Sequence, residues 1–395
     1  MYKTSEPTKD VFDSGRRGLR HDGVRRANEK TVLTVVAFNS GVSNADIARI
    51  SGLAPQTVSA ILIDLERQGL ISRGPVLRGR RGQPISTPIA MPPSSLSRMG
   101  VAGWRHLDVV LLSMHARVLR HHHAEHDYPD AESIFETIGA LVDTFKADLT
   151  PTQKSRLLDL GLSMPCALAE SLHLLGAPDE QISMWRSHDP VQALEARTGL
   201  EVTMFNDGNA GCWAELIAIA PPRPANIIYL LVSHFIAAGI VVDGVLWEGQ
   251  TGNAAELGSI LIDLPGQPPQ VAHRVASIWA LRNQLDAAGH CTAGLSGKAL
   301  EQAVPASEAE QWTGNAARAL AQVIYNTTTV LEQPLVVIDT ILSRETTIEL
   351  AERVEVELKA LPRRNLSGPR VVPGQLGRLA PAIGAAELPL FRRYF

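Results

Sequence analysis

The sequence has few or none of three features that would each define a class of protein. Its 395 residues include three cysteines, Cys166, Cys212 and Cys291, which are too few and too scattered for a disulfide framework or a cysteine-only zinc site. No run of 18 or more residues is apolar, which excludes a membrane-spanning helix. The first residues lack the apolar core of a signal peptide. We therefore expect a cytoplasmic protein with no membrane partner.

The net charge of −4 combines two parts of opposite sign. Residues 1–90 carry 14 Lys and Arg against 8 Asp and Glu, a net charge of +6. The other 305 residues carry 23 against 33, a net charge of −10. A basic segment joined to an acidic body is typical of a nucleic-acid-binding head attached to another domain.

The basic part predicts an arm followed by a small helical domain. Residues 1–22 are polar and lack apolar periodicity, which predicts a disordered basic arm. Apolar spacing predicts helices over 24–38 and 44–51, the second capped by Ser43 with Asp46 three residues later. A Gly-containing turn precedes a third helix that begins at Pro55. With a basic hairpin after it, this order predicts a winged helix-turn-helix over residues 23–92.

The exposed face near the start of the third predicted helix suits base recognition. Gln56, Thr57 and Ser59 are small or amide side chains that can reach base edges in a major groove. Gln56 in particular can bind adenine through two hydrogen bonds. These residues predict double-stranded operator DNA as the partner.

The loop of the predicted hairpin supplies positive charge. Arg78, Arg80 and Arg81 alternate there with glycine and suit phosphates or a narrow minor groove. The alternative interpretation is a three-helix module for protein contacts whose basic loop is merely solvated.

Residues 93–395 alternate strand-like and helix-like stretches, which predicts α/β architecture. Strands are expected over 161–164, 202–205, 226–232 and 335–338, and Asp243-Gly244 predicts a tight hairpin. Helices are expected over 275–285, 316–331 and 379–391. The run His121–His123 with His126 could chelate a metal, but we interpret it as a solvated turn.

Five segments in a fixed order carry a resemblance to a known family. They are Gly52–Ser59, Gly79–Pro84, Asn206–Ala210 with Ala214-Glu215, Gly249–Gly258 and Ala382–Ala386. From about Leu19 onward the chain resembles the repressor branch of the ROK family, which contains bacterial repressors and sugar kinases. The resemblance implies an actin-like, sugar-kinase-type body in two lobes, a carbohydrate effector in the cleft, and a homodimer or homotetramer.

The resemblance also implies a set of ligand-binding residues. In the family's kinases an Asn-Asp pair and a later Glu hold the sugar hydroxyls, and the Asp is the general base. Asn206, Asp207 and Glu256 match these positions, and Ser259 stands where a family His contacts the sugar. Two carboxylates and an amide suit several vicinal hydroxyls.

The sequence departs from the family's kinases in both phosphate loops and in the zinc motif. The first loop, Gly100–His106, lacks the expected Asp and Thr, and the second has Phe235 where a glycine-rich turn is expected. Since glycines let backbone N–H groups approach phosphates, we expect no phosphoryl transfer. The segment Gly266–Ala272 has no cysteine, so we expect neither a metal nor a cofactor.

The sequence therefore predicts a regulator that is not an enzyme: a repressor of carbohydrate-utilisation genes controlled by a sugar or sugar phosphate. Two alternatives stay open. One is an ATP-dependent sugar kinase with a DNA-binding head. The other is a ligand-independent DNA-binding protein with a vestigial cleft.

Overall fold

The computed structural model describes residues 21–39, 41–78, 84–86, 89–90, 97–113, 116–155, 157–165, 168–362 and 368–394. The chain divides into two compact units, Met1–Ser95 with Phe391–Phe395 and Leu96–Leu390. The sequence places a domain boundary nearby, between residues 92 and 93. The predicted arm over 1–22 lies outside the described residues except for its last two, with which the first helix begins.

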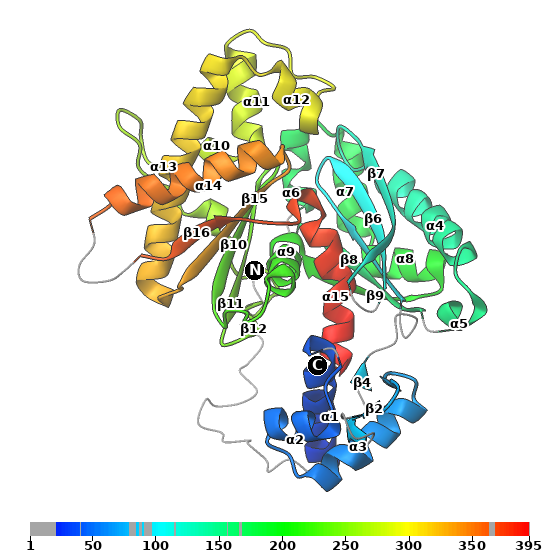
Figure 1. Ribbon diagram of the computed structural model, residues 1–395. Coiled ribbons are helices and arrows are strands. Elements are labelled where there is room, and N and C mark those ends of the chain that lie inside the picture. The colour runs from blue at the N-terminus through cyan, green and yellow to red at the C-terminus, as the bar shows by residue number, and fades with distance from the viewer. Residues whose placement is uncertain are drawn as a thin grey trace, which may run out of the picture. The chain divides into compact units, whose positions relative to one another are not determined.

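The first unit contains helices followed by short strands (Figure 1). Its elements are α1 His21–Phe38, α2 Asn44–Ser51, α3 Pro55–Arg67, β1 Ser72–Arg73, β2 Leu77–Arg78, β3 Pro84–Ser86 and β4 Ile89–Ala90. The predicted cap of α2 is confirmed, because the Ser43 hydroxyl accepts the N–H of Asp46 and the Asp46 carboxylate accepts the N–H of Ser43, both at 3.2 Å. Gly52, with φ 70°, ends α2, and Pro55 begins α3.

The core of the first unit is built from one face of each helix. The buried side chains of α3 recur at helical spacing and form its inward face. They are Val58, Ile61, Leu62 and Leu65. Leu33 of α1 and Ile47 of α2 are likewise buried. After α3, β1 pairs antiparallel with β4 and β2 with β3, which forms a hairpin in two parts.

The second unit begins with a five-stranded sheet in the order β7-β6-β5-β8-β9. Its strands are β5 Ser97–Ala102, β6 His106–Ser113, β7 Val118–Glu125, β8 Leu157–Met164 and β9 Glu201–Asn206. The intervening helices are α4 Ala131–Ala147, α5 Pro151–Lys154, α6 Leu168–Ser171, η1 Leu172–Leu175, α7 Asp179–Ser187 and α8 Pro190–Thr198. Leu107, Val109 and Leu111 of β6 share a core with α4 and α8, so His106 and Asp108 lie on the opposite face of the sheet.

A second five-stranded sheet has the order β12-β11-β10-β15-β16. Its strands are β10 Ile227–Val232, β11 Ile236–Val242, β12 Val245–Leu246, β15 Leu335–Thr340 and β16 Arg370–Pro373. The remaining elements are α9 Asp207–Ala218, η2 Leu257–Ser259, β13 Leu261–Ile262, β14 Gln270–Val271, α10 His273–Ala276, α11 Ile278–Ala287, α12 Gly297–Ala303, α13 Ala306–Leu331, α14 Arg344–Ala360, η3 Gly377–Leu379 and α15 Ala380–Tyr394. The predicted hairpin is confirmed, with Asp243 at φ 52° and Gly244 at φ 75°.

The second sheet is covered on both faces (Figure 1). Buried side chains of β10, such as Ile228 and Leu230, share a core with α13 and α14. Tyr229 points the other way and meets α9 at Gly211. Helix α9 follows β9 of the first sheet directly, so one short segment joins the two sheets.

Two predictions about local structure in the body were wrong. His121, His122 and His123 lie in β7 and not in a turn, because strand alternation brings His121 and His123 to the buried carboxylate of Asp108. The helix expected over 275–285 is two helices, because Ser277 adopts an extended conformation and caps α11. Among the described residues, no helix is long and apolar enough to cross a membrane.

The closest backbone contacts of the body yield a stability prediction. A Cβ placed on Gly384 of α15 would lie 1.8 Å from the carbonyl oxygen of Ala210 in α9, whereas one on Gly314 of α13 would meet nothing within 4 Å. We expect Gly384→Ala to destabilise the body by about 3 kcal/mol, the upper end of the usual cost of overpacking, because the added Cβ meets backbone. Gly314→Ala, the control, should be neutral or stabilising by about 0.5–1 kcal/mol. Chemical denaturation of both variants tests this, and equal effects would contradict it.

Candidate functional site

A cavity of about 460 Å³ opens where α9, the β10–β11 turn and the segment before η2 converge. Its volume is in the range of small-molecule sites. Of the four ligand-binding residues predicted from the sequence, all four line it: Asn206, Asp207, Glu256 and Ser259. The structure therefore brings together residues that lie up to 53 positions apart in the sequence.

Asn206 and Asp207 lie at the junction between β9 and α9. The Asn206 side chain caps the helix by accepting the N–H of Asn209 at 3.1 Å, and its amide donates to Asn253 at 3.3 Å. Asp207 is 7% exposed, and its carboxylate accepts the N–H of Gly208 at 2.9 Å. Burial raises the pKa of Asp207 to about 6, and the nearby negative charge of Glu256 adds to this effect. Asp207 is thus ionised at neutral pH but close to its titration range.

Glu256 contacts an imidazole that the sequence analysis missed. His273 Nε2 lies 3.1 Å from Glu256 Oε1. The N–H of Ile236 donates to His273 Nδ1 at 3.1 Å, so Nε2 carries the proton and donates to Glu256. This hydrogen bond lowers the pKa of Glu256. Ser259 adds a weaker contact, since its hydroxyl donates to Glu256 Oε1 at 3.4 Å.

The close approach of His273 depends on a glycine. A Cβ on Gly258 would lie 2.1 Å from Cε1 of the His273 ring. The preceding backbone is also unusual, because Ala255 has φ 69°. Such conformations cluster at functional sites. In the sequence, His273 lies between the apolar pairs Val271-Ala272 and Val275-Ala276. This pattern does not indicate that its partner, Glu256, lies 17 residues earlier.

Aromatic rings surround the turn that the sequence resemblance assigns to the second phosphate loop. The Phe235 ring lies edge-on to Trp104, with 4.9 Å between the ring centroids. Its centroid is 5.7 Å from that of His273 and 5.9 Å from that of Trp279. Phe235 itself is buried at 9% exposure. The Ser233 hydroxyl donates to the Phe235 carbonyl at 2.6 Å, which fixes the turn from within.

The residues of α3 that the sequence predicts to contact bases differ in their exposure and hydrogen bonding. Gln56 is exposed near the start of α3, and Thr57 is half-buried. The Ser59 hydroxyl donates to the Pro55 carbonyl at 2.9 Å and accepts from Asn44 at 2.8 Å, so it joins α2 to α3.

The predicted basic loop is less completely described. Arg78 lies in β2, whereas Arg80 and Arg81 lie outside the described residues.

The sequence pattern of the ROK family matches residues 101–391. The chain belongs to the ROK family. A second pattern, that of a Crp-like helix-turn-helix domain, matches residues 20–79. Relatives of known role include the xylose repressor of Bacillus spizizenii, which is 25% identical over 266 residues. That alignment covers 65% of this chain and 66% of the repressor, so it spans just under two thirds of the relative's length.

Solved ROK-family structures share the fold. A transcriptional regulator described as a homologue of the E. coli MLC protein has a TM-score of 0.66 at 18% identity, covering 94% of this chain and 98% of its own. A glucokinase from Streptomyces griseus, solved with glucose and AMPPNP, has a TM-score of 0.60 at 18% identity, covering 74% and 98%. The predicted sugar-kinase-like α/β body with a helix-turn-helix head is confirmed. The family thus includes both repressors and kinases.

The raised pKa of Asp207 yields a second prediction. Between the ordinary pKa of 3.8 and about 6 the folded state holds a proton that the unfolded state releases, so ionisation of Asp207 destabilises the fold as the pH rises. We expect Asp207→Asn to increase the free energy of unfolding by about 2–3 kcal/mol at pH 8 and by nothing near pH 4. Denaturation at both pH values measures it. Asp243→Asn, in an exposed turn, should have no such pH-dependent effect, and a gain at pH 4 equal to that at pH 8 would contradict the assignment.

Proposed function

We propose that this ROK-family chain is a DNA-binding repressor whose body binds a sugar or sugar phosphate without phosphorylating it. The observation that carries the proposal is the composition of the cavity. Asp207 and Glu256, whose carboxylates can bind hydroxyl groups, line the cavity together with the buried ring of Phe235. Phe235 lies in the turn that is rich in glycine in phosphate-transferring relatives. The cavity keeps acceptors for sugar hydroxyls but presents a side chain where backbone N–H groups would approach ATP.

The proposed effector site consists of Asn206, Asp207, Glu256, Ser259 and His273. The carboxylate of Asp207 accepts hydroxyl protons, and the Glu256–His273 pair presents both an acceptor and a donor. A sugar that binds one conformation of the body more tightly shifts the protein towards that conformation, which is the thermodynamic requirement for control of DNA binding.

We further propose that residues 23–92 form the DNA-binding domain and 93–395 the effector domain, in two lobes. Gln56 and Thr57 read bases, and Arg78, Arg80 and Arg81 contact the DNA backbone or minor groove. Ser59 is better placed to position α3 against α2, because both of its hydrogen-bonding roles are used within the domain. A two-fold operator calls for a homodimer or homotetramer.

The effector prediction separates the repressor from a kinase. Asp207→Ala should fold and bind operator DNA, but it should need at least about tenfold more sugar for the same response, because ligand hydroxyls lose a charged acceptor. Operator release over a panel of sugars and sugar phosphates measures this, and Asp243→Ala in the exposed turn is the control. ATP turnover by the wild type that requires a sugar and disappears in Asp207→Ala would establish the kinase alternative. If the variant responds to sugar as the wild type does, the effector binds at another site.

Base reading by Gln56 gives a further prediction. Gln56→Ala should weaken operator binding by about 1–3 kcal/mol and relax the preference at one base pair per half-site, while binding to random DNA stays nearly unchanged. Gln68, exposed at the other end of α3, is the matched control, and Gln68→Ala should change neither affinity. Binding titrations on operator and random duplexes at fixed salt decide the matter. Equal losses on both duplexes would make Gln56 a positioning residue.

A further inference from the structure

The proposed effector cavity has an apolar part that the proposed sugar-binding residues do not form. Trp104, Phe235 and Trp279 line it together with Pro165 and Leu174. The cavity has a volume of about 460 Å³, whereas a monosaccharide fills roughly 200 Å³ at the packing density of condensed matter. A bound sugar therefore leaves space for a second chemical group.

Ring contacts lead from the polar part of the cavity to its aromatic part. The His273 imidazole lies 3.1 Å from Glu256, and its centroid is 5.7 Å from that of Phe235. The Phe235 centroid is in turn 4.9 Å from that of Trp104 and 5.9 Å from that of Trp279. We call Trp104, Phe235 and Trp279 the aromatic wall. Because His273 contacts both parts, a substituent on a sugar bound at Glu256 can reach this wall.

The aromatic wall is supported from within the protein. Trp104 and Phe235 are buried in a core that includes Leu168 and Leu172. Trp279, at the start of α11, is half-buried and packs against the same core. A ligand that meets a preformed apolar surface loses little free energy to the ordering of side chains.

The polar side chains of the cavity gather around two residues. Asn206 contacts Asn253, and Glu256 contacts both His273 and Ser259. The other polar side chains in the lining are Asp207, Ser171 and Arg274. Arg274 is exposed, and it is the one arginine or lysine among the described residues that line the cavity.

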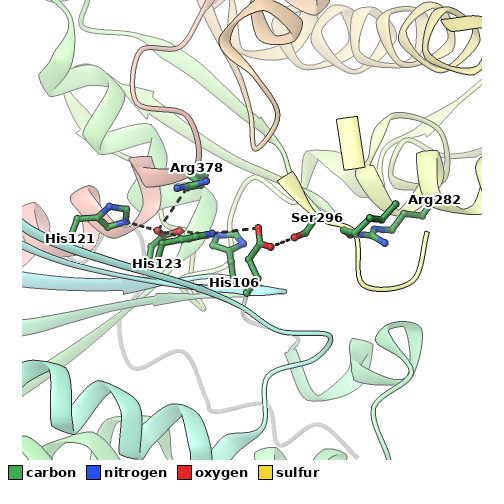
Figure 2. Close-up of polar contacts among 9 residues, drawn as sticks. His106, His121, His123, Arg282, Ser296 and Arg378 are labelled. Carbon is green, nitrogen blue, oxygen red and sulfur yellow. Dashed lines mark hydrogen bonds and ion pairs between the residues drawn. The ribbon is translucent and has the colours of Figure 1, made fainter. Parts of the chain in front are cut away.

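Charged groups close in sequence to the aromatic wall are engaged elsewhere. Arg105, which follows Trp104, pairs with Asp127 at 2.5 Å and lines a separate, smaller cavity. The histidines beside that cavity lie on one sheet face, as Figure 2 shows, and His123 Nδ1 lies 2.9 Å from the Asp108 carboxylate. The two cavities share no lining residue.

This distribution of polar groups restricts what the aromatic wall can bind. A second sugar ring would bury several hydroxyls against Trp104, Phe235 and Trp279, whose rings offer few hydrogen-bond partners, and burial of unpaired hydroxyls is unfavourable. A phosphoryl group would lack the cluster of cations that normally binds it. An aromatic group needs neither, and it can add to the edge-to-face contact that Trp104 and Phe235 already make.

We propose that the aromatic wall binds an aryl substituent of the effector, so that the ligand is a sugar linked to an aromatic group. The inference rests on the proposed function, since it extends the same cavity. Asp207 and Glu256 hold the hydroxyls of the sugar, while the wall buries the apolar surface of the aryl group. Two positions of attachment share this chemistry, the anomeric oxygen and another hydroxyl of the sugar.

Titration of the full chain with matched pairs of ligands tests the proposal. The probes are the methyl and phenyl glycosides of common pentoses and hexoses, in both anomeric forms, and the same methyl glycosides with a benzoyl ester on the terminal hydroxyl. For at least one sugar, we expect an arylated ligand to bind at least about tenfold more tightly than the methyl glycoside, because of the apolar surface that it buries. The arylated ligand that gains most identifies the position of attachment.

Two variants locate this gain in affinity. Trp279→Ala should lower the ratio of aryl to methyl affinity by about tenfold, and Leu174→Asn by about threefold, because each removes apolar surface from the lining. Trp247→Ala and Leu261→Asn are the matched controls and should leave the ratio unchanged, since both residues are exposed and neither lines the cavity. Leu174 is also exposed, so its variant keeps the test valid if Trp279→Ala does not fold.

The results separate this proposal from the proposed function. If arylated and methyl glycosides bind equally, or if the ratio is the same in Trp279→Ala, Leu174→Asn and the wild type, the aromatic wall is not a ligand site, although sugar binding stands. Disaccharides that bind more tightly than any arylated sugar would also overturn the proposal, in favour of a second sugar ring. If none of these glycosides binds, the effector site itself is rejected and the proposal with it.

Discussion

The architecture of the body depends on close backbone contacts between α9 and its neighbours, which glycines on α9 and on α15 make possible. A Cβ on Gly208 would lie 2.1 Å from the carbonyl oxygen of Ala238 in β11, and one on Gly384 of α15 would lie 1.8 Å from that of Ala210. Helix α9 is therefore in backbone contact with an element on each side of it. Because proteins are close-packed, such contacts transmit displacement with little loss. The N-terminal end of α9 carries Asn206 and Asp207, so backbone contacts fix the position of these proposed effector-binding groups.

The other end of α9 fixes a different part of the body. Glu215 accepts the N–H groups of Gln375 at 2.8 Å and Leu376 at 2.6 Å, and Asp339 accepts that of Gly377 at 3.0 Å. Burial and the nearby Glu215 raise the pKa of Asp339, so a proton held by this pair of carboxyl groups avoids like-charge repulsion. These contacts position the segment that ends in Arg378. One helix thus connects Asp207, a proposed effector-binding residue, with the segment that carries Arg378.

Local signals in the sequence predicted local structure well. Ser43 and Asp46 predicted the start of α2, and Asp243-Gly244 predicted a hairpin, because both depend on neighbouring residues alone. The histidine run was misassigned, because its polarity suggested solvent while its real partner, Asp108, lies on the adjacent strand. The resemblance located Asp207 and Glu256, but not His273, whose role depends on a contact across 17 residues that no periodicity encodes.

The turn between β10 and β11 links the two chemical differences between this chain and the family's kinases. The first is Phe235, a buried ring in place of a glycine-rich phosphate loop. The second is the absence of a His at position 259. His273 of α10 instead supplies an imidazole that contacts Glu256. The residue after Phe235 fixes that contact, since the N–H of Ile236 donates to His273 Nδ1 and leaves Nε2–H to donate to Glu256. The β10–β11 turn therefore orients an imidazole towards the proposed effector cavity. Under the proposed function, the same local geometry disfavours phosphoryl transfer and preserves a polar site for a sugar.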